Sequence, residues 1–251
     1  MSPGRRTRQL AVLLAMMGLA AVAAGPARAA YQATVDTNVS AFSLDCLKIN
    51  DTNPSKMRVA ALAGFRNLGF TTTSYSGAVF TRAHVLARTA ADWGYYVHSH
   101  GDHYWNPDGK QYAGFKEDAG LCTGAKTVFS KEIAAARATQ KANLVIMSTC
   151  HLGESVTTMP GAFGIPQVKA VTGTWAGPNF YFGYLGSAWD SDELAFEIGF
   201  WNALGPGLGV GKAYDMAKLG AFNAGFAANW YGSYDWTGRA GPLPTGCTRC
   251  L

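Results

Sequence analysis

A cysteine and a histidine in this sequence each follow an apolar segment and each precede a glycine at which the chain can turn. Cys150 follows the run 144–149, and His100 follows the run 93–99 and directly precedes Gly101. An imidazole beside a thiol can take its proton or hold it as the thiolate, which is how a cysteine nucleophile is activated. The pair therefore indicates nucleophilic catalysis by Cys150, with His100 as its base. A buried structural cysteine is the alternative when the Cys150 segment is considered alone.

For these two side chains to meet, their segments must be neighbouring parallel strands that end at the same edge of a sheet. A short, unbroken apolar run is typical of a strand buried on both faces. In open α/β sheets, ligands and chemistry gather at the carboxyl ends of such strands. Strand and helix patterns alternate along the chain, so the sequence predicts an α/β fold, a three-layer helix–sheet–helix sandwich with a mostly parallel sheet.

The predicted elements follow from apolar periodicity and from the residues that begin and end helices. The predicted strands are 35–44, 70–75, 93–99, 144–149, 180–185 and 230–236, with a short one at 167–172. The predicted helices are 55–68, 81–91, 130–140, 190–204 and 210–229. Two long connections separate them, 104–127 and 153–178. The first is predicted to be irregular and to lie over the site, because a loop of that length in a compact domain is usually functional.

The order of these motifs resembles the caspase-fold cysteine peptidases, which include caspases, metacaspases, gingipains and CHAT domains. The resemblance extends downstream to the strand at 180–186 and to the helical segments 200–204 and 213–217, and it covers about residues 60–230. Cys150 lies 50 residues after His100, which is about the spacing of the caspase pair. The caspase pentapeptide around the cysteine is absent from 148–152, so the similarity is to the wider group. The resemblance implies a caspase-like fold and peptidase activity on a peptide or protein substrate.

The same resemblance implies roles for individual residues. Cys150 would attack the scissile carbonyl, His100 would assist as acid or base, and the amides of Gly101 and Cys150 would stabilise the oxyanion. Asp102 is a supporting residue, because a carboxylate near His100 could orient its ring or raise its pKa. Under this interpretation the protein needs no cofactor.

Specificity is expected from the end of the strand 180–185, which places Ser187, Trp189 and Asp190 beside the substrate. In gingipain-like relatives, a tryptophan and acidic groups near this edge line a pocket for a basic side chain, and this segment is similar. Cleavage after a basic residue is therefore one expectation. In the alternative, Asp190 is a helix N-cap and Glu193 completes a capping box.

A second hypothesis assigns the histidine-rich stretch to a metal. His98, His100, Asp102 and His103 form an HxHxDH pattern, which is the first zinc motif of metallo-β-lactamase-type hydrolases. That fold needs further ligands downstream, yet the chain after His103 has one histidine, His151. A helix is also predicted before the motif, where the zinc fold has a long antiparallel region. A catalytically inactive binding domain on the caspase fold is the third alternative.

The N-terminus has the features of a secretory signal peptide. Arg5, Arg6 and Arg8 precede the apolar stretch 10–24, and 27–29 fits a small-x-small cleavage site. We therefore expect a signal peptide at 1–29, a single domain at 30–251 with a Gly/Pro/Cys-containing tail, and secretion without a membrane anchor. With Arg28, the predicted signal peptide contains four arginines, which account for most of the net charge of +5. The remaining charges nearly balance, which gives no electrostatic case for nucleic-acid binding.

Five cysteines in an exported chain leave one without an intramolecular partner. In an oxidising compartment the remaining thiol should be the one that chemistry needs, which is Cys150. Three pairings of the other four stay open, with a preference for the pair within the C-terminal tail. These disulfide candidates are Cys46, Cys122, Cys247 and Cys250.

Overall fold

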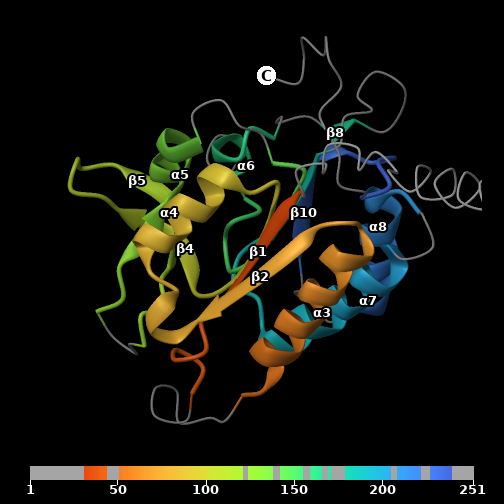
Figure 1. Cartoon of the computed structure of the whole chain (residues 1–251), viewed down its shortest axis with the longest axis horizontal. Helices are drawn as coiled ribbons and strands as arrows, with labels where there is room; N and C mark the ends of the chain where they lie inside the picture. The colour runs from red at the N-terminus through yellow and green to blue at the C-terminus, as the bar shows by residue number, and fades with distance from the viewer. Residues whose placement is uncertain are drawn as a thin grey trace, which may run out of the picture. The chain divides into compact units, whose positions relative to one another are not determined.

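A mixed, mostly parallel sheet forms the centre of the fold (Figure 1). The computed structural model describes residues 31–43, 51–120, 124–137, 142–154, 159–165, 169–170, 179–204, 208–221 and 227–238. Tyr31–Leu251 forms one compact unit, and the predicted signal peptide at 1–29 lies outside the described residues. Within the described part, no helix is long and apolar enough to cross a membrane.

Seven strands in the described residues make up this sheet, in the order β2-β1-β3-β7-β9-β10-β8. The first five run parallel to one another, β10 is antiparallel to β9, and β8 is parallel to β10. The α/β class and the mostly parallel sheet predicted from the sequence are therefore confirmed. The bounds are β1 Gln32–Thr37, β2 Thr71–Ser76, β3 Gly94–His98, β7 Leu144–Ser148, β8 Lys169–Ala170, β9 Phe180–Tyr184 and β10 Ala228–Ser233.

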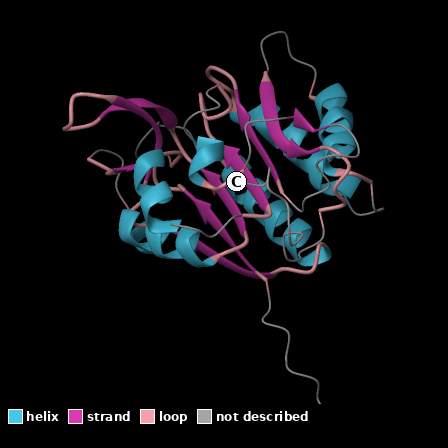
Figure 2. Ribbon diagram, turned by 90° about the horizontal axis from the view of Figure 1, so that it is seen from above, coloured by secondary structure: helices cyan, strands magenta, loops and turns pink. Residues whose placement is uncertain are grey.

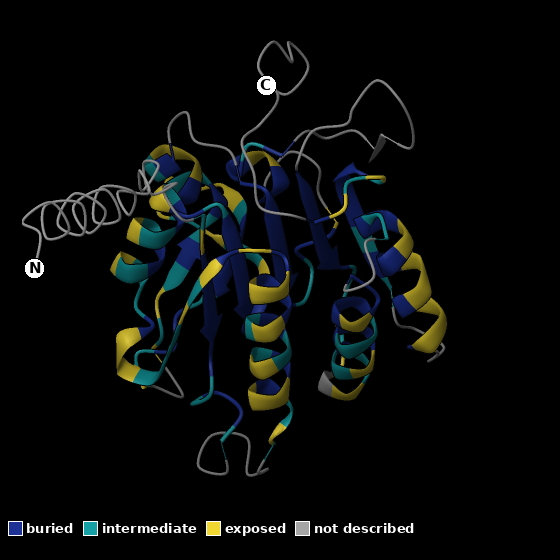
Figure 3. Ribbon diagram, turned by 45° about the vertical axis from the view of Figure 1, so that its right-hand side comes forward, coloured by how far each residue is buried: buried dark blue, intermediate teal, exposed yellow. Residues whose placement is uncertain are grey.

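Helices cover both faces of this sheet (Figure 2). One face packs against α3 (Asn53–Asn67), α7 (Asp190–Leu204) and α8 (Val210–Gly220). The other face packs against α4 (Arg82–Ala91), α5 (Ser130–Arg137) and the short α6 (Met159–Ala162). The helices turn their buried faces toward the sheet and their exposed faces toward solvent (Figure 3).

The central strands β3, β7 and β9 are buried along their whole length, which explains why they are apolar except at the ends of β3 and β7, His98 and Ser148. Successive side chains of a strand point to opposite faces, so neighbours in sequence enter different cores. Tyr96 and Ile146 lie in the core under α3 and α7, whereas Tyr95 and Val145 lie in the core under α4 and α5. This alternation fixes which residues face which layer all the way to the strand ends.

The connection 104–127 was predicted to be irregular, and that prediction is wrong. It contributes to a second, three-stranded antiparallel sheet made of β4 (Gly101–Trp105), β5 (Gln111–Lys116) and β6 (Thr127–Phe129). A tight turn closes the hairpin between β4 and β5: the amide of Asn106 donates to the carbonyl of Lys110, and Gly109 has a φ of 75°. Gly109 permits that left-handed backbone without strain.

Other element bounds differ from the prediction at the ends. The first strand was predicted at 35–44 and is found at Gln32–Thr37. It stops there because the side chain of Asn38 accepts the amide of Ala41 and turns the chain. The last helix was predicted to run to 229 but ends at Gly220, before β10 begins at Ala228. Helix α7 begins and ends as predicted.

Candidate active site

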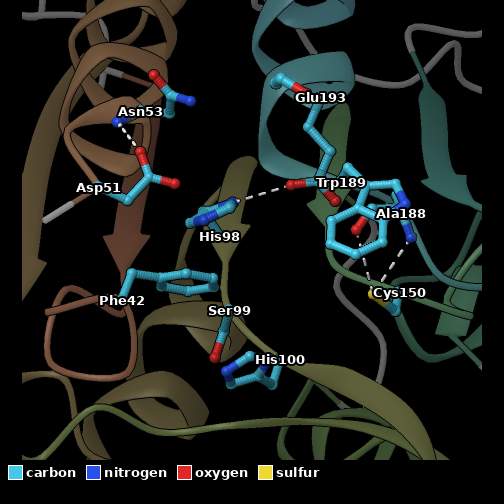
Figure 4. Close-up of a pocket in the computed structure, with 11 residues that line it drawn as sticks. Phe42, Asp51, Asn53, His98, Ser99, His100, Cys150, Ala188, Trp189 and Glu193 are labelled. Atoms are coloured by element: carbon cyan, nitrogen blue, oxygen red, sulfur yellow. Dashed lines mark hydrogen bonds and ion pairs between the residues drawn. The ribbon is translucent and has the colours of Figure 1, made fainter. Parts of the chain in front are cut away.

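The ends of β3 and β7 bring His100 and Cys150 to the same edge of the sheet. The two strands are parallel and in register, with His98 opposite Ser148, and the amide of Ser99 donates to the carbonyl of Ser148 at 3.2 Å. His100 and Cys150 each lie two residues beyond that pair. Both side chains line one cavity of about 430 Å³ (Figure 4). The parallel arrangement predicted for these strands is thus found.

Cys150 is half-buried and carries a thiol. The backbone amide of Ala188 donates to its sulfur at 3.5 Å, and the sulfur lies 3.9 Å from the Ala188 carbonyl. An N–H aimed at sulfur stabilises the thiolate more than the thiol. The chain then turns sharply, since His151 has a φ of 63° and its amide donates to the carbonyl of Gly186. This turn presents Cys150 at the cavity wall.

His100 is exposed at the cavity wall, with one ring face stacked on Phe42 at a centroid distance of 4.9 Å. Its backbone carbonyl accepts the amide of Lys116 at 2.9 Å, so the second sheet holds it in place. Partial burial of the ring, and then the positive charge of Lys116, lower the pKa of His100. A lowered pKa keeps the imidazole neutral near pH 7, in the form that can accept a proton.

His98 forms the cavity floor with Glu193 from α7. The His98 ring is 1% exposed, and its Nδ1 lies 2.9 Å from Ser148 Oγ and 3.5 Å from Glu193 Oε2. Burial lowers the pKa of His98 to about 3. The sequence analysis considered His98 as a ligand of the alternative zinc motif, whereas the structure places it in the cavity beside Glu193.

The cavity also contains residues that the sequence analysis did not single out. Asp51 and Phe42 line it, and the Asp51 carboxylate accepts the amide of Asn53 at 2.8 Å. Glu193, considered only as a capping residue, is 3% exposed and faces His98. No local motif marks Asp51 or Phe42. Their place follows from the loop after β1 and from the start of α3.

The structure brings Trp189, but not Ser187, of the predicted substrate-binding residues into the cavity lining. Trp189 lines the cavity and is 76% exposed. Ser187 is exposed beside it but is not part of the cavity lining. Asp190 is the first residue of α7, and its side chain lies outside the described part. The carbonyl of Trp189 accepts the amide of Glu193 at 3.0 Å, so Trp189 begins the hydrogen-bond ladder of the helix.

Gly101 lies against the backbone of Cys150. A Cβ at Gly101 would come within 2.6 Å of the Cys150 carbonyl oxygen, so only glycine allows this approach. Asp102 is exposed on β4. Within the described residues its carboxylate accepts the amide of His103 at 2.7 Å and has no hydrogen bond to His100.

The donors of the predicted zinc motif diverge. His98 points to the cavity floor, whereas His103 and His151 turn to Glu154, at 3.9 Å and 2.7 Å from its carboxylate oxygens. Among the described residues, no group of three or more His, Cys, Asp or Glu side chains could hold a metal ion. The disulfide candidates Cys46, Cys122, Cys247 and Cys250 lie outside the described residues.

No protein-family model matches the chain, and no match is found among curated proteins.

Proposed function

We propose that this protein is a cysteine peptidase in which Cys150 is the nucleophile and His100 the acid and base. The observation that carries the proposal is the in-register pair of strand ends that places both side chains on the wall of one cavity. Two features of the surroundings support it. The Ala188 amide is directed at the sulfur, and the lowered pKa of His100 keeps its ring neutral.

In this mechanism the thiol proton passes to an imidazole nitrogen of His100 as the sulfur attacks the peptide carbonyl. A C–S bond forms, the carbonyl π electrons move to oxygen, and the amides of Gly101 and Cys150 stabilise the oxyanion. Collapse of this intermediate breaks the C–N bond, and the leaving amine takes the proton from His100. Water then hydrolyses the thioester, with His100 as general base, and regenerates the thiol.

The proposed substrate carries a basic residue before the cleaved bond. Asp51 and Glu193 give the cavity beside Cys150 two carboxylates, and Phe42 and Trp189 give it aromatic walls. A carboxylate attracts a guanidinium or ammonium group, and an aromatic wall packs against its apolar stem. The proposed basic preference therefore rests on Asp51 and Glu193 together with the predicted Trp189, because the side chain of the predicted Asp190 lies outside the described residues.

A set of fluorogenic peptides tests both the catalytic pair and the basic preference. The peptides differ only at the residue before the cleaved bond. Cleavage should favour Arg and Lys, should be abolished by Cys150→Ala and His100→Ala, and should persist with a chelator present. Asp51→Asn should weaken the basic preference, whereas Asp192→Asn, outside the cavity lining, should not. Full activity in Cys150→Ala would refute the nucleophile. Inhibition by a chelator that zinc reverses would favour the zinc hydrolase, and a thiol probe that never labels Cys150 would favour a binding domain.

The proposal includes export of the chain after removal of residues 1–29. The mass of the protein recovered from the culture medium measures the cleavage site. A mass equal to that of residues 30–251 is expected, and a mass that retains the N-terminal arginines would contradict signal cleavage.

A further inference from the structure

A second cavity, of about 400 Å³, lies beside His100. His100 lines both cavities, whereas Cys150 lines only the first. The second cavity is walled by Tyr104 of β4, Lys116 of β5 and Asn38 after β1. His100 therefore separates a cavity that contains Asp51 and Glu193 from one that contains a lysine.

Lys116 is the charged group of this second cavity. Its Nζ donates to Thr127 Oγ1 at 2.8 Å and lies 4.6 Å from the centroid of the Tyr104 ring. Over the described part of the chain, Lys116 forms no ion pair with a carboxylate. An ammonium held by a hydroxyl and a ring face keeps donor capacity for an anion.

The acidic residues that follow Lys116 in the chain are engaged elsewhere. Glu117 accepts the amides of Arg82 at 2.6 Å and Lys126 at 3.0 Å. Asp118 accepts the amides of Val39 at 2.9 Å and Gly77 at 2.6 Å. Both carboxylates thus brace neighbouring backbone, and neither lines the cavity.

The amide nitrogen of Asn38 is also used internally, because it donates to Ser99 Oγ and to the Glu117 carbonyl, each at 3.2 Å. Asn38 is therefore a structural wall of the cavity. Recognition of a ligand there falls to Lys116, with the Tyr104 ring beside it.

The side of the substrate that this cavity receives follows from the chemistry. The carbonyl carbon must lie against the Cys150 sulfur, and the leaving nitrogen must lie against the His100 ring that protonates it. The chain before the cut therefore extends along the cavity that contains Cys150. The chain after the cut extends past His100, toward the cavity that contains Lys116.

We propose that Lys116 makes the second cavity a subsite for a carboxylate on the leaving side of the substrate. This inference rests on the proposed peptidase function, since that function defines which side leaves. The carboxylate has two possible sources with one chemistry. It is the side chain of an Asp or Glu directly after the cut, or it is the free C-terminus of a single leaving residue. The substrate then carries a basic group before the cut and an acidic group after it.

The test uses a peptide set with Arg fixed before the cut. One pair of extended peptides has Asp or Asn directly after the cut. A second pair ends at that residue with a free carboxylate or with an amide. For one pair, kcat/KM should favour the acidic member about 3- to 10-fold, as expected for a half-exposed charge-assisted contact. The pair that shows the preference identifies the source of the carboxylate.

Charge variants of Lys116 separate recognition from structural support. Lys116→Met should abolish the preference, Lys116→Arg should keep it, and Lys116→Glu should reverse it, so that the Asn or amide peptide is favoured. Lys110→Met removes the same charge from an exposed turn and should leave the preference unchanged. A preference that survives Lys116→Met, or equal kcat/KM within both pairs, would overturn the inference.

A binding measurement distinguishes failure of this subsite from failure of the peptidase function. Labelled forms of the same peptides are titrated with the Cys150→Ala chain, with and without Lys116→Met, and fluorescence anisotropy is recorded. If the acidic peptides bind more tightly and this gain depends on Lys116, the subsite is supported. If the wild-type chain then cleaves none of these peptides, only the peptidase function is refuted. Cleavage without any charge preference in either assay refutes only the subsite.

Discussion

Replacement of Glu197 tests how the fold supports the cavity floor. Glu197 lies on α7, is fully buried, and accepts the hydroxyls of Tyr96 and Tyr184, each at 2.8 Å. The hydroxyl of Ser148 is a further hydrogen-bond partner, and Ser148 also contacts His98 in the floor. Burial outweighs these hydrogen bonds and raises the pKa of Glu197 from 4.5 to about 7.

The raised pKa of Glu197 determines the direction and the size of the pH dependence of the free energy of unfolding. The folded chain holds the Glu197 proton more tightly than the unfolded chain does, so stability falls as pH rises from about 4.5 to about 7 and then stays level. A shift of this size corresponds to about 3 kcal/mol, at roughly 1.4 kcal/mol for each pH unit. Between pH 5 and pH 8, this one group should lower the free energy of unfolding by about 2–3 kcal/mol.

Urea unfolding at a series of pH values measures this contribution. Glu197→Gln cannot ionise, so its profile should lack the fall between pH 5 and pH 8 that the wild-type chain shows. Asp102→Asn removes an exposed carboxylate and should follow the wild-type profile. Parallel profiles for wild type and Glu197→Gln would refute the reasoning, because they would mean that Glu197 does not titrate with a raised pKa.

Three further predictions concern the site. Gly101→Ala places a methyl group 2.6 Å from the Cys150 carbonyl oxygen, so alkylation of Cys150 and peptide cleavage should both slow by about 100-fold. Gly220→Ala is the control: Gly220 has open space around it, so the substitution should leave both rates unchanged. Lys116→Met removes the positive charge that lowers the pKa of His100, so NMR titration should find that pKa higher than in wild type, and an unchanged value would contradict the electrostatic coupling. Thiol titration of the exported, non-reduced chain should find one alkylatable cysteine, Cys150, and two or more would contradict pairing of the other four.

The arrangement of the central strands could be predicted because their burial leaves a direct mark on the sequence. A strand covered on both faces is apolar over most of its length, and the stretches 93–97 and 144–147 show this pattern before the polar residues at each strand end. Parallel pairing then brings the following residues to one edge, which is why His100 and Cys150 could be placed together. Helix α7 was predicted to the residue because acidic residues mark its first turn and the Gly-rich stretch after Leu204 marks its end.

The second sheet and the cavity floor could not be predicted, for a different physical reason. The strand β5 has an exposed end and a buried middle, so its alternation is short and resembles a loop with aromatic residues. The floor depends on contacts between segments distant in the chain, such as His98 with Glu193. Glu193 alone has the sequence features of a helix cap, and only the packing of α7 against β3 and β7 reveals that it faces a buried imidazole.

The two cavities place His100 between charges of opposite sign, and this arrangement links substrate binding to the state of the base. Lys116 lowers the pKa of His100 from one side, and Phe42 covers its ring. Tyr104, Cys150, His98, Asp51 and Glu193 are the other titratable groups that line the two cavities. The pKa of Tyr104 is raised to about 12 by burial, Asp102 and Cys150. Under the proposed function, a substrate carboxylate at Lys116 offsets the charge that disfavours imidazolium. The same contact that selects the leaving side would then stabilise the protonated His100 that donates to the leaving amine.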